Sequence, residues 1–235
     1  MSLLVERKFR RPRIWSNKEL KKFASLFQGS IINVSGWKDA DKEDDCYKNY
    51  FTNASSYFIS NYKSEARGFQ GFSNEFFLDL TEDLKEKDLG KYDVVFNHTT
   101  LEHIYDIKKA FLNLCLMSRD IVILVVPFLQ QMHADYGDYW RFTPSAIKKL
   151  FEENKMELLY LSFNNEKHTS VYIFAIASKN PEKWKDKISY KYNIECKKDF
   201  FDFSENFIGC RAITNGIIYK IKVVVLAFIS KFFNH

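Results

Sequence analysis

The chain has 235 residues, which is long enough for one α/β domain with a complete hydrophobic core and a tail. Hydrophobic residues make up 46% and aromatic residues 17% of it, and this composition excludes an intrinsically disordered protein. The net charge of +5 is compatible with an anionic ligand or a membrane face, but it is too small to indicate a nucleic-acid-binding protein.

Cysteine usage and the N-terminal residues predict the compartment. The four cysteines lie far apart without a CxxC pair, which argues against a disulfide framework or a zinc site and favours the reducing cytoplasm. The N-terminus lacks the apolar segment of a secretory signal. The abundance of Phe, Tyr, Lys, Asn and Ile is typical of AT-rich bacterial coding sequence.

Residues 1–29 are predicted to form a basic arm followed by a helix. The sequence SNKE at residues 16–19 matches a capping box, which predicts a helix that begins near Ser16 and ends near Gly29. The cationic side chains that precede it indicate either a solvated arm or contact with phosphate or acidic lipid. They are Arg7, Lys8, Arg10, Arg11 and Arg13.

Residues 30–180 alternate between apolar strands and helices. The predicted strands cover residues 30–34, 57–61, 75–80, 93–97, 120–127, 156–163 and 171–178. Helices are predicted over 107–117 and from Pro144, where Thr143 is the expected N-cap. The alternation ends in a hairpin, so we predict a Rossmann-like α/β fold with a mostly parallel seven-stranded sheet, flanking helices and an antiparallel last strand.

Residues 181–235 form a C-terminal extension whose apolar, basic tail covers residues 217–233. Its longest charge-free run is shorter than the ~20 residues that a membrane-spanning helix needs. The tail is predicted either to dock on the domain or on a second subunit, giving a homodimer, or to make peripheral membrane contact.

Two segments carry a resemblance to a known family. DVVFNHTTLEH at residues 93–103 resembles the fourth-strand motif of class I S-adenosylmethionine (SAM)-dependent methyltransferases. VPFLQQMHADYGDYWRFTP at residues 126–144 is similar to a segment of a type 11/12-like branch that is associated with bacterial surface-glycan synthesis. Over residues 30–179 the resemblance implies an enzyme with SAM as cofactor that O-methylates a saccharide or saccharide-linked acceptor.

The resemblance also implies where the cofactor binds. The family has an acid-x-Gly-x-Gly turn after the first strand, but here Asn33, Ser35 and Trp37 occupy those three positions, so the motif is degenerate. The family's ribose-binding acid after the second strand is also replaced, by an asparagine. The residues expected to bind the cofactor are Ser35, Gly36, Asn61, Asp79, Asn97, His98 and Thr99.

The degenerate turn leaves an alternative open. Trp37 at the second glycine position would fill the space of the adenosine, and the chain would then be a catalytically inactive methyltransferase-like subunit for binding or scaffolding. RNA or protein methylation is disfavoured, because the signature of amino-group methyltransferases is absent after the fourth strand.

The loop after the fifth strand is predicted to bind the acceptor. His133 is the candidate general base, because an imidazole has a pKa near neutrality. Tyr139 and Arg141 are candidates for substrate binding, although Arg141 could instead pair with Asp135 or Asp138. We expect no metal site, and we expect Glu102 and His103 to tie the preceding loop to its helix.

Overall fold

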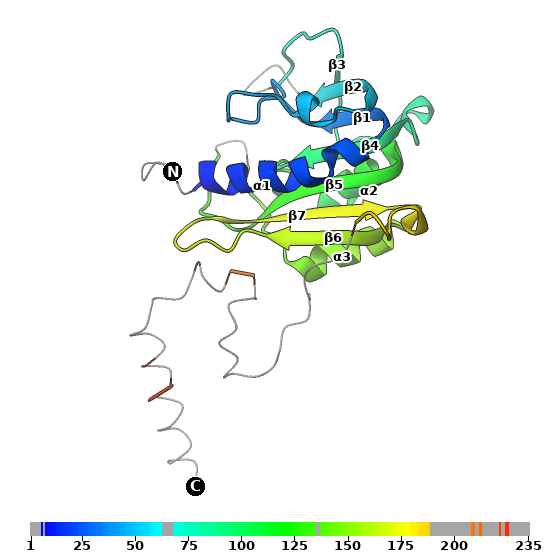
Figure 1. Ribbon diagram of the computed structural model, residues 1–235. Coiled ribbons are helices and arrows are strands. Elements are labelled where there is room, and N and C mark those ends of the chain that lie inside the picture. Colours follow the sequence, from blue (N-terminus) through cyan, green and yellow to red (C-terminus); the bar gives the residue numbers. More distant parts are fainter. Residues whose placement is uncertain are drawn as a thin grey trace.

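A single seven-stranded sheet forms the centre of the molecule (Figure 1). The computed structural model describes residues 8–62, 68–134 and 137–188, together with residue 6 and six residues between 208 and 225. The strand order is β3-β2-β1-β4-β5-β7-β6. The strands are β1 Gly29–Val34, β2 Ala54–Asn61, β3 Glu75–Phe77, β4 Tyr92–His98, β5 Ser118–Leu129, β6 Glu157–Phe163 and β7 Val171–Ser178.

Strand direction agrees with the predicted architecture. The pairs among β1 to β5 are parallel, whereas β7 runs antiparallel to both β5 and β6. The Rossmann-like sheet with an antiparallel last strand is therefore confirmed. β5 lies between β4 and β7, and the almost continuous burial of its side chains follows from coverage of both faces.

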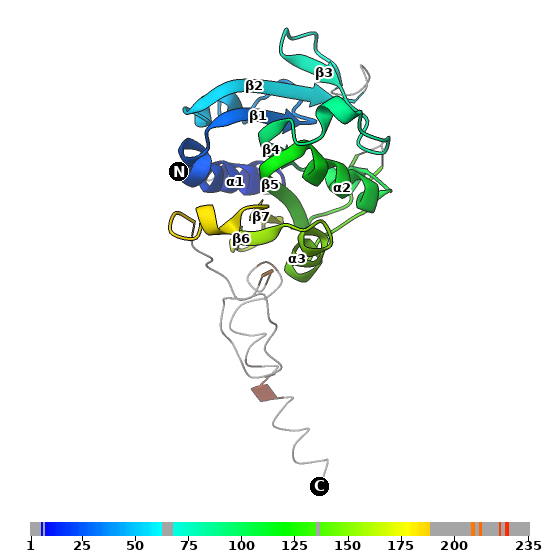
Figure 2. The same cartoon turned by 90° about the vertical axis from the view of Figure 1, so that its right-hand side faces the viewer.

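Helices cover both faces of the sheet, as Figure 2 shows, with α1 on one side and α2 and α3 on the other. The α-helices are α1 Arg10–Phe23, α2 Ile107–Met117 and α3 Pro144–Glu153; short 3₁₀ turns cover Ala24–Leu26, Tyr47–Tyr50, Glu86–Asp88, Leu101–His103 and Pro181–Lys183. Leu20 of α1 belongs to the same buried cluster as Phe96 of β4. Phe111 and Phe151 pack against each other in the opposite cluster, with ring centroids 4.9 Å apart.

The first helix begins earlier than predicted. It starts at Arg10, so the interpretation of residues 16–19 as a capping box is wrong. The carboxylate of Glu6 accepts hydrogen bonds from the backbone N–H groups of Phe9 and Arg10, and Pro12 lies in the first turn, where a backbone N–H is not needed. Ser16 is buried in mid-helix, and Arg10, Arg11 and Arg13 belong to α1 and not to an arm. By contrast, Thr143 does cap α3, accepting from the N–H of Ala146 at 3.1 Å.

The predicted domain limits at 29/30 and 180/181 do not coincide with separate cores. Phe23 and Phe27 precede β1, and Trp184 follows β7. All three side chains belong to the same buried cluster as residues of the sheet. Among the described residues no helix is both long and apolar enough to cross a membrane. The predicted tail, residues 217–233, lies outside the described residues apart from three isolated positions, so its docking, homodimer and membrane alternatives stay predictions.

A buried carboxylate attaches α1 to the far edge of the sheet. Glu19 accepts hydrogen bonds from the hydroxyls of Tyr160, at 2.7 Å, and Ser162, at 3.0 Å, and it pairs with Lys22. Glu19→Ala should lower the free energy of unfolding by about 2 kcal/mol, because two buried hydroxyls lose their shared acceptor. Urea denaturation measures this change. Glu152→Ala, at a half-exposed pair on α3, should change it by less than about 0.5 kcal/mol; equal effects would contradict the proposed attachment.

Candidate functional site

A cavity of about 590 Å³ opens at the carboxyl ends of β1, β2 and β4, a size typical of small-molecule sites. Ligands of open α/β sheets bind at this edge of the sheet. Seven of the residues predicted from the sequence are on its wall: Ser35, Gly36, Asn61, Asp79, His98, Thr99 and Tyr139. Asn97, His133 and Arg141 do not line it.

The turn after β1 has the backbone conformation of a glycine-rich turn without the glycines. Ser35 has φ 57° and Trp37 φ 52°, and these are the two positions where the family has glycine. A left-handed conformation costs a residue with a side chain about 1–2 kcal/mol. Gly36 is needed for another reason, because a Cβ at that position would lie 2.6 Å from Nδ2 of Asn33.

Hydrogen bonds to one carboxylate hold this turn. Asp39, itself at φ 59°, accepts from Nδ2 of Asn33 and from the hydroxyl of Tyr57, both at 2.7 Å. A third bond comes from the backbone N–H of Lys48 at 2.8 Å. Burial raises the pKa of Asp39, although these three donors oppose the rise. Asp39 therefore holds the turn from inside the protein and does not line the cavity.

Asn61, at the end of β2, is bonded mainly to the protein. Its Oδ1 accepts from the N–H of Trp37 at 2.7 Å, and its Nδ2 donates to the carbonyl of Trp37 at 3.1 Å and to the carboxylate of Glu75. Both amide hydrogens are therefore used, and one lone pair of Oδ1 is left for a ligand hydroxyl. Asn61 lines the cavity, but its first role is to hold Trp37 in place.

Asn97 supports the site from beneath. Its side chain is fully buried, and Nδ2 donates to the carbonyl of Val34 at 3.0 Å, just before the strained turn. Its Oδ1 is buried without a hydrogen-bond partner among the described residues. Asn97 thus bonds to the end of β1 and does not line the cavity, and its contact with a cofactor stays a prediction.

Arg13 of α1 lies at the site, although the sequence predicted for it either a solvated arm or contact with phosphate or acidic lipid. Its guanidinium lines the cavity and donates to the hydroxyl of Tyr47 at 3.0 Å and to Oγ1 of Thr99 at 3.1 Å. Among the described residues no carboxylate forms an ion pair with it. The spacing of Arg13, Ser16 and Leu20 places them on one face of a helix. This spacing could have predicted that Arg13 faces the domain, but the capping-box interpretation began the helix after Arg13.

His98 connects α1 to the loop after β4. Its Nε2 lies 2.8 Å from Oγ of Ser16, which donates to a backbone carbonyl, and its Nδ1 lies 3.1 Å from Oγ1 of Thr99, which accepts from Arg13. These roles assign a neutral ring with the proton on Nε2. Burial, together with the charge of Arg13, lowers the pKa of His98 well below its usual value, so it is a structural member of the wall.

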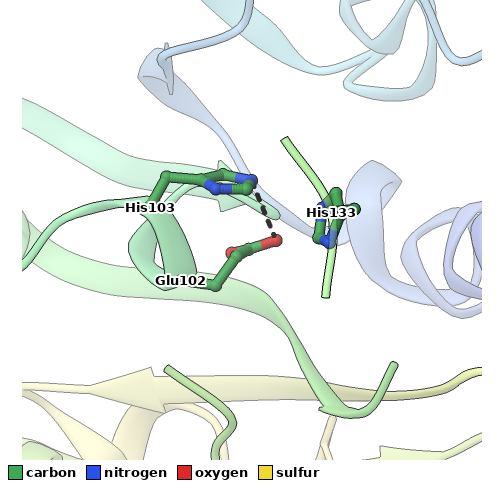
Figure 3. Close-up of side chains that lie close together, drawn as sticks. All are labelled: Glu102, His103 and His133. Carbon is green, nitrogen blue, oxygen red and sulfur yellow. Dashed lines mark ion pairs between the residues drawn. The ribbon is translucent and has the colours of Figure 1, made fainter. Parts of the chain in front are cut away.

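Glu102, His103 and His133 lie together beside the cavity, and Figure 3 shows their side chains turned toward one another. Glu102 is 1% exposed, and burial raises its pKa to about 8. Nδ1 of His103 donates to the carbonyl of Gly137 at 2.6 Å, which leaves Nε2 as the basic nitrogen of the neutral ring. Burial also lowers the pKa of His103. His103 is on the cavity wall and His133 packs behind it, with ring centroids 5.0 Å apart.

Arg141, a candidate for substrate binding in the sequence, forms an ion pair within the protein. Arg141 donates to both carboxylate oxygens of Asp138, at 2.5 and 2.7 Å, and its remaining N–H groups meet backbone carbonyls of the same loop. The bonds from Arg141 lower the pKa of Asp138 to about 2. The salt bridge to Asp138, one of the alternatives left open by the sequence, is therefore the one that forms, and Arg141 shapes the loop that presents Tyr139.

Solved structures share this architecture. One is a methyltransferase-like protein from Bacillus halodurans C-125, with TM-score 0.53 and 13% identity over 69% of this chain and 97% of that one. The fold is that of SAM-dependent methyltransferases. The magnesium protoporphyrin IX methyltransferase of Synechocystis PCC 6803, crystallised with SAM, matches with TM-score 0.52 and 11% identity over 76% of this chain and 85% of that one.

A third structure, a SAM-dependent methyltransferase from Clostridium acetobutylicum ATCC 824, has TM-score 0.50 and 9% identity over 71% of this chain and 91% of that one. No protein-family model and no curated protein matches the sequence. At these identities the similarity establishes the methyltransferase fold alone. The surface-glycan branch that the sequence resembles is not among the proteins matched above.

Adjacent substitutions in the first turn should have opposite effects on stability. Gly36→Ala should lower the free energy of unfolding by about 2 kcal/mol, because its Cβ collides with Asn33 and disturbs the bond to Asp39. Ser35→Gly should leave stability unchanged or raise it by up to about 1 kcal/mol, because the left-handed strain is released. Chemical denaturation measures both. A loss at Ser35→Gly as large as that at Gly36→Ala would show that strain does not govern this turn.

Proposed function

We propose that the chain is a SAM-dependent methyltransferase that methylates a hydroxyl group. The observation that carries this proposal is the cavity beside a turn that keeps left-handed conformations at Ser35 and Trp37. Strain of this kind is retained where the surrounding structure holds it in place, and it concentrates at ligand sites. Glycine usually takes this backbone conformation where a ligand approaches the main chain, and Ser35 and Trp37 keep the conformation here.

The charges and polar groups suit the two ends of SAM. Arg13 offers the α-carboxylate of the methionine moiety a guanidinium that has no anionic partner among the described residues. Asp79 lines the cavity, and within the described part of the chain only its Oδ1 accepts hydrogen bonds, from Thr81. Its second oxygen is available for the adenine amino group, while Oδ1 of Asn61 can accept one ribose hydroxyl.

The acceptor would bind at the histidine end. Its hydroxyl oxygen attacks the methyl carbon, the carbon–sulfur bond breaks to release S-adenosylhomocysteine, and the hydroxyl proton passes to an imidazole. We assign the direct contact to His103, because it is on the cavity wall with Nε2 as its basic nitrogen. His133, the base predicted from the sequence, lies behind it, with Asp138 3.3 Å from its Nδ1.

The proposed acceptor class is a saccharide or a saccharide-linked molecule. Tyr105 and Tyr139 line the cavity, are 74% and 51% exposed, and lie with ring centroids 5.5 Å apart. Exposed aromatic faces of this kind stack on the C–H faces of sugar rings while their hydroxyls meet the sugar hydroxyls. A role in bacterial surface-glycan synthesis in the cytoplasm rests on the sequence resemblance.

The alternative of a catalytically inactive binding subunit is favoured by two observations. Asn61 occupies the position where a carboxylate would bind the ribose, and its side-chain amide is hydrogen-bonded to the N–H and the carbonyl of Trp37. Trp37 itself is on the cavity wall. Calorimetric titration of the purified protein with SAM separates the two functions, because an inactive subunit of this type would have lost the cofactor.

SAM binding should depend on Arg13. Arg13→Met removes the cation but keeps the length of the side chain, and it should weaken SAM binding at least tenfold, since a charged hydrogen bond contributes about 1.5–3 kcal/mol. Isothermal calorimetry measures the affinity. Arg11→Met is the matched control, because Arg11 lies on the same helix, pairs with Glu166 and does not line the cavity. Absence of SAM binding by the wild-type protein would support the inactive alternative, and equal affinities of the two variants would remove Arg13 from the site.

Methyl transfer should depend on the two cavity-end histidines. His103→Ala should lower the formation of S-adenosylhomocysteine with a saccharide acceptor by about 10²–10⁴-fold, the usual contribution of a general base. His133→Ala should lower it by a smaller factor, because His133 packs behind His103 and does not line the cavity. SAM affinity should stay nearly constant. His168→Ala, in an exposed turn, serves as the control. If both cluster variants keep near-normal turnover, the base lies elsewhere.

A further inference from the structure

We propose that Glu102, His103 and His133 together bind a divalent transition-metal cation at the acceptor end of the cavity. Each residue offers one ligand atom, and these atoms all lie within 4.8 Å of one another (Figure 3). Two imidazoles and one carboxylate form a donor set that suits Zn²⁺, Co²⁺ and Mn²⁺. The sequence predicted no metal site, because the cluster HADYGD at residues 133–138 is a weak match to a set of metal ligands and Glu102 and His103 were expected to be structural.

The spacing of the first two ligands suits a shared cation. Oε1 of Glu102 lies 3.8 Å from Nε2 of His103, which is too far for a hydrogen bond. Oε2 of Glu102 is buried and has no hydrogen-bond partner among the described residues. A buried carboxylate oxygen without a partner is costly, and a bound cation compensates that cost. Ligands about 2.1 Å from one tetrahedral cation are about 3.4 Å apart. The three ligand atoms lie within 4.8 Å of one another, so a pair must close by up to about 1.4 Å when the cation binds.

Supporting groups orient the imidazoles as in known metal sites. The carbonyl of Gly137 accepts from Nδ1 of His103 at 2.6 Å, which directs Nε2 toward Glu102. The carboxylate of Asp138 lies 3.3 Å from Nδ1 of His133. Histidine ligands of metals are usually held by a carbonyl or a carboxylate in this way.

The surrounding charges permit a cation. Arg141 is the nearer positive group on the loop, and its charge is neutralised by its two bonds to Asp138. Arg13 also acts on Glu102 from across the site. The carboxylate of SAM, proposed above to pair with Arg13, would reduce that repulsion, so cofactor and cation should bind more tightly together than separately.

The cation would have an open position toward the cavity, because His103 is part of the cavity wall. An oxygen of the acceptor can fill this position, and coordination lowers the pKa of a hydroxyl or water. In that form the cation replaces a free imidazole in activating the acceptor. This role rests on the proposed function, whereas binding of the cation does not.

Equilibrium dialysis of the untagged, chelator-treated protein against Zn²⁺ tests the proposal. One cation per chain should bind, and Glu102→Gln and His133→Gln should each weaken binding at least tenfold. His168→Gln, which removes an exposed histidine, should bind like the wild type. Circular dichroism confirms that each variant is folded, and two independent ligand variants keep the test valid if one of them is not.

Substitution with Co²⁺ identifies the ligands. Nitrogen and oxygen ligands give only weak visible bands, whereas a cysteine ligand adds intense near-ultraviolet absorption, and we expect the former. No binding by the wild type, binding that both variants retain, or a thiolate spectrum would each overturn the site. SAM titration of the same chelated samples is read separately, so loss of the metal site and loss of the proposed function are distinguishable.

Discussion

The hydrogen bonds that hold the turn after β1 are the constraint on which the rest of the site depends. Asp39 gathers donors from Asn33, Tyr57 and Lys48, while the amide of Asn61 fixes the backbone of Trp37 on both sides. These bonds come from β1, β2 and the connection between them. They impose on Ser35 and Trp37 a conformation that glycine would adopt without strain. The cavity is open because the chain turns sharply here.

The first helix closes the site from the other side. One face of α1 carries Arg13 and Ser16 toward the loop after β4, and Glu19 toward β6. The helix therefore aligns the cavity with the far edge of the sheet through polar contacts, while Leu20 and Phe23 bury its apolar surface. A change that shifts α1 should thus alter the cavity and the sheet edge together.

The loop after β5 owes its shape to a partly buried ion pair between Arg141 and Asp138. Because Arg141 spends all its donors on Asp138 and on loop carbonyls, the loop brings Tyr139 to the cavity and His133 against His103. Two backbone N–H groups of this loop also donate to the carbonyl of Glu102. Glu102 is thereby buried beside two imidazoles, and this arrangement of one acid and two bases is the chemically distinctive part of the molecule.

Local patterns in the sequence were sufficient to predict the strands, the parallel or antiparallel direction of each strand and the cap at Thr143. These features follow from hydrophobic periodicity, from the alternation of strands with helices and from short-range hydrogen bonding. They also predicted which loops meet at the cavity, since the carboxyl ends of parallel strands share one edge. The roles of Arg13, Asp39, Asn97 and Glu102 were decided only by the tertiary structure. Each role depends on burial or on a partner distant in the chain, as in the contact of Asn97 with Val34. The sequence around a single polar residue does not show whether folding leaves its side chain in solvent or buries it without a partner.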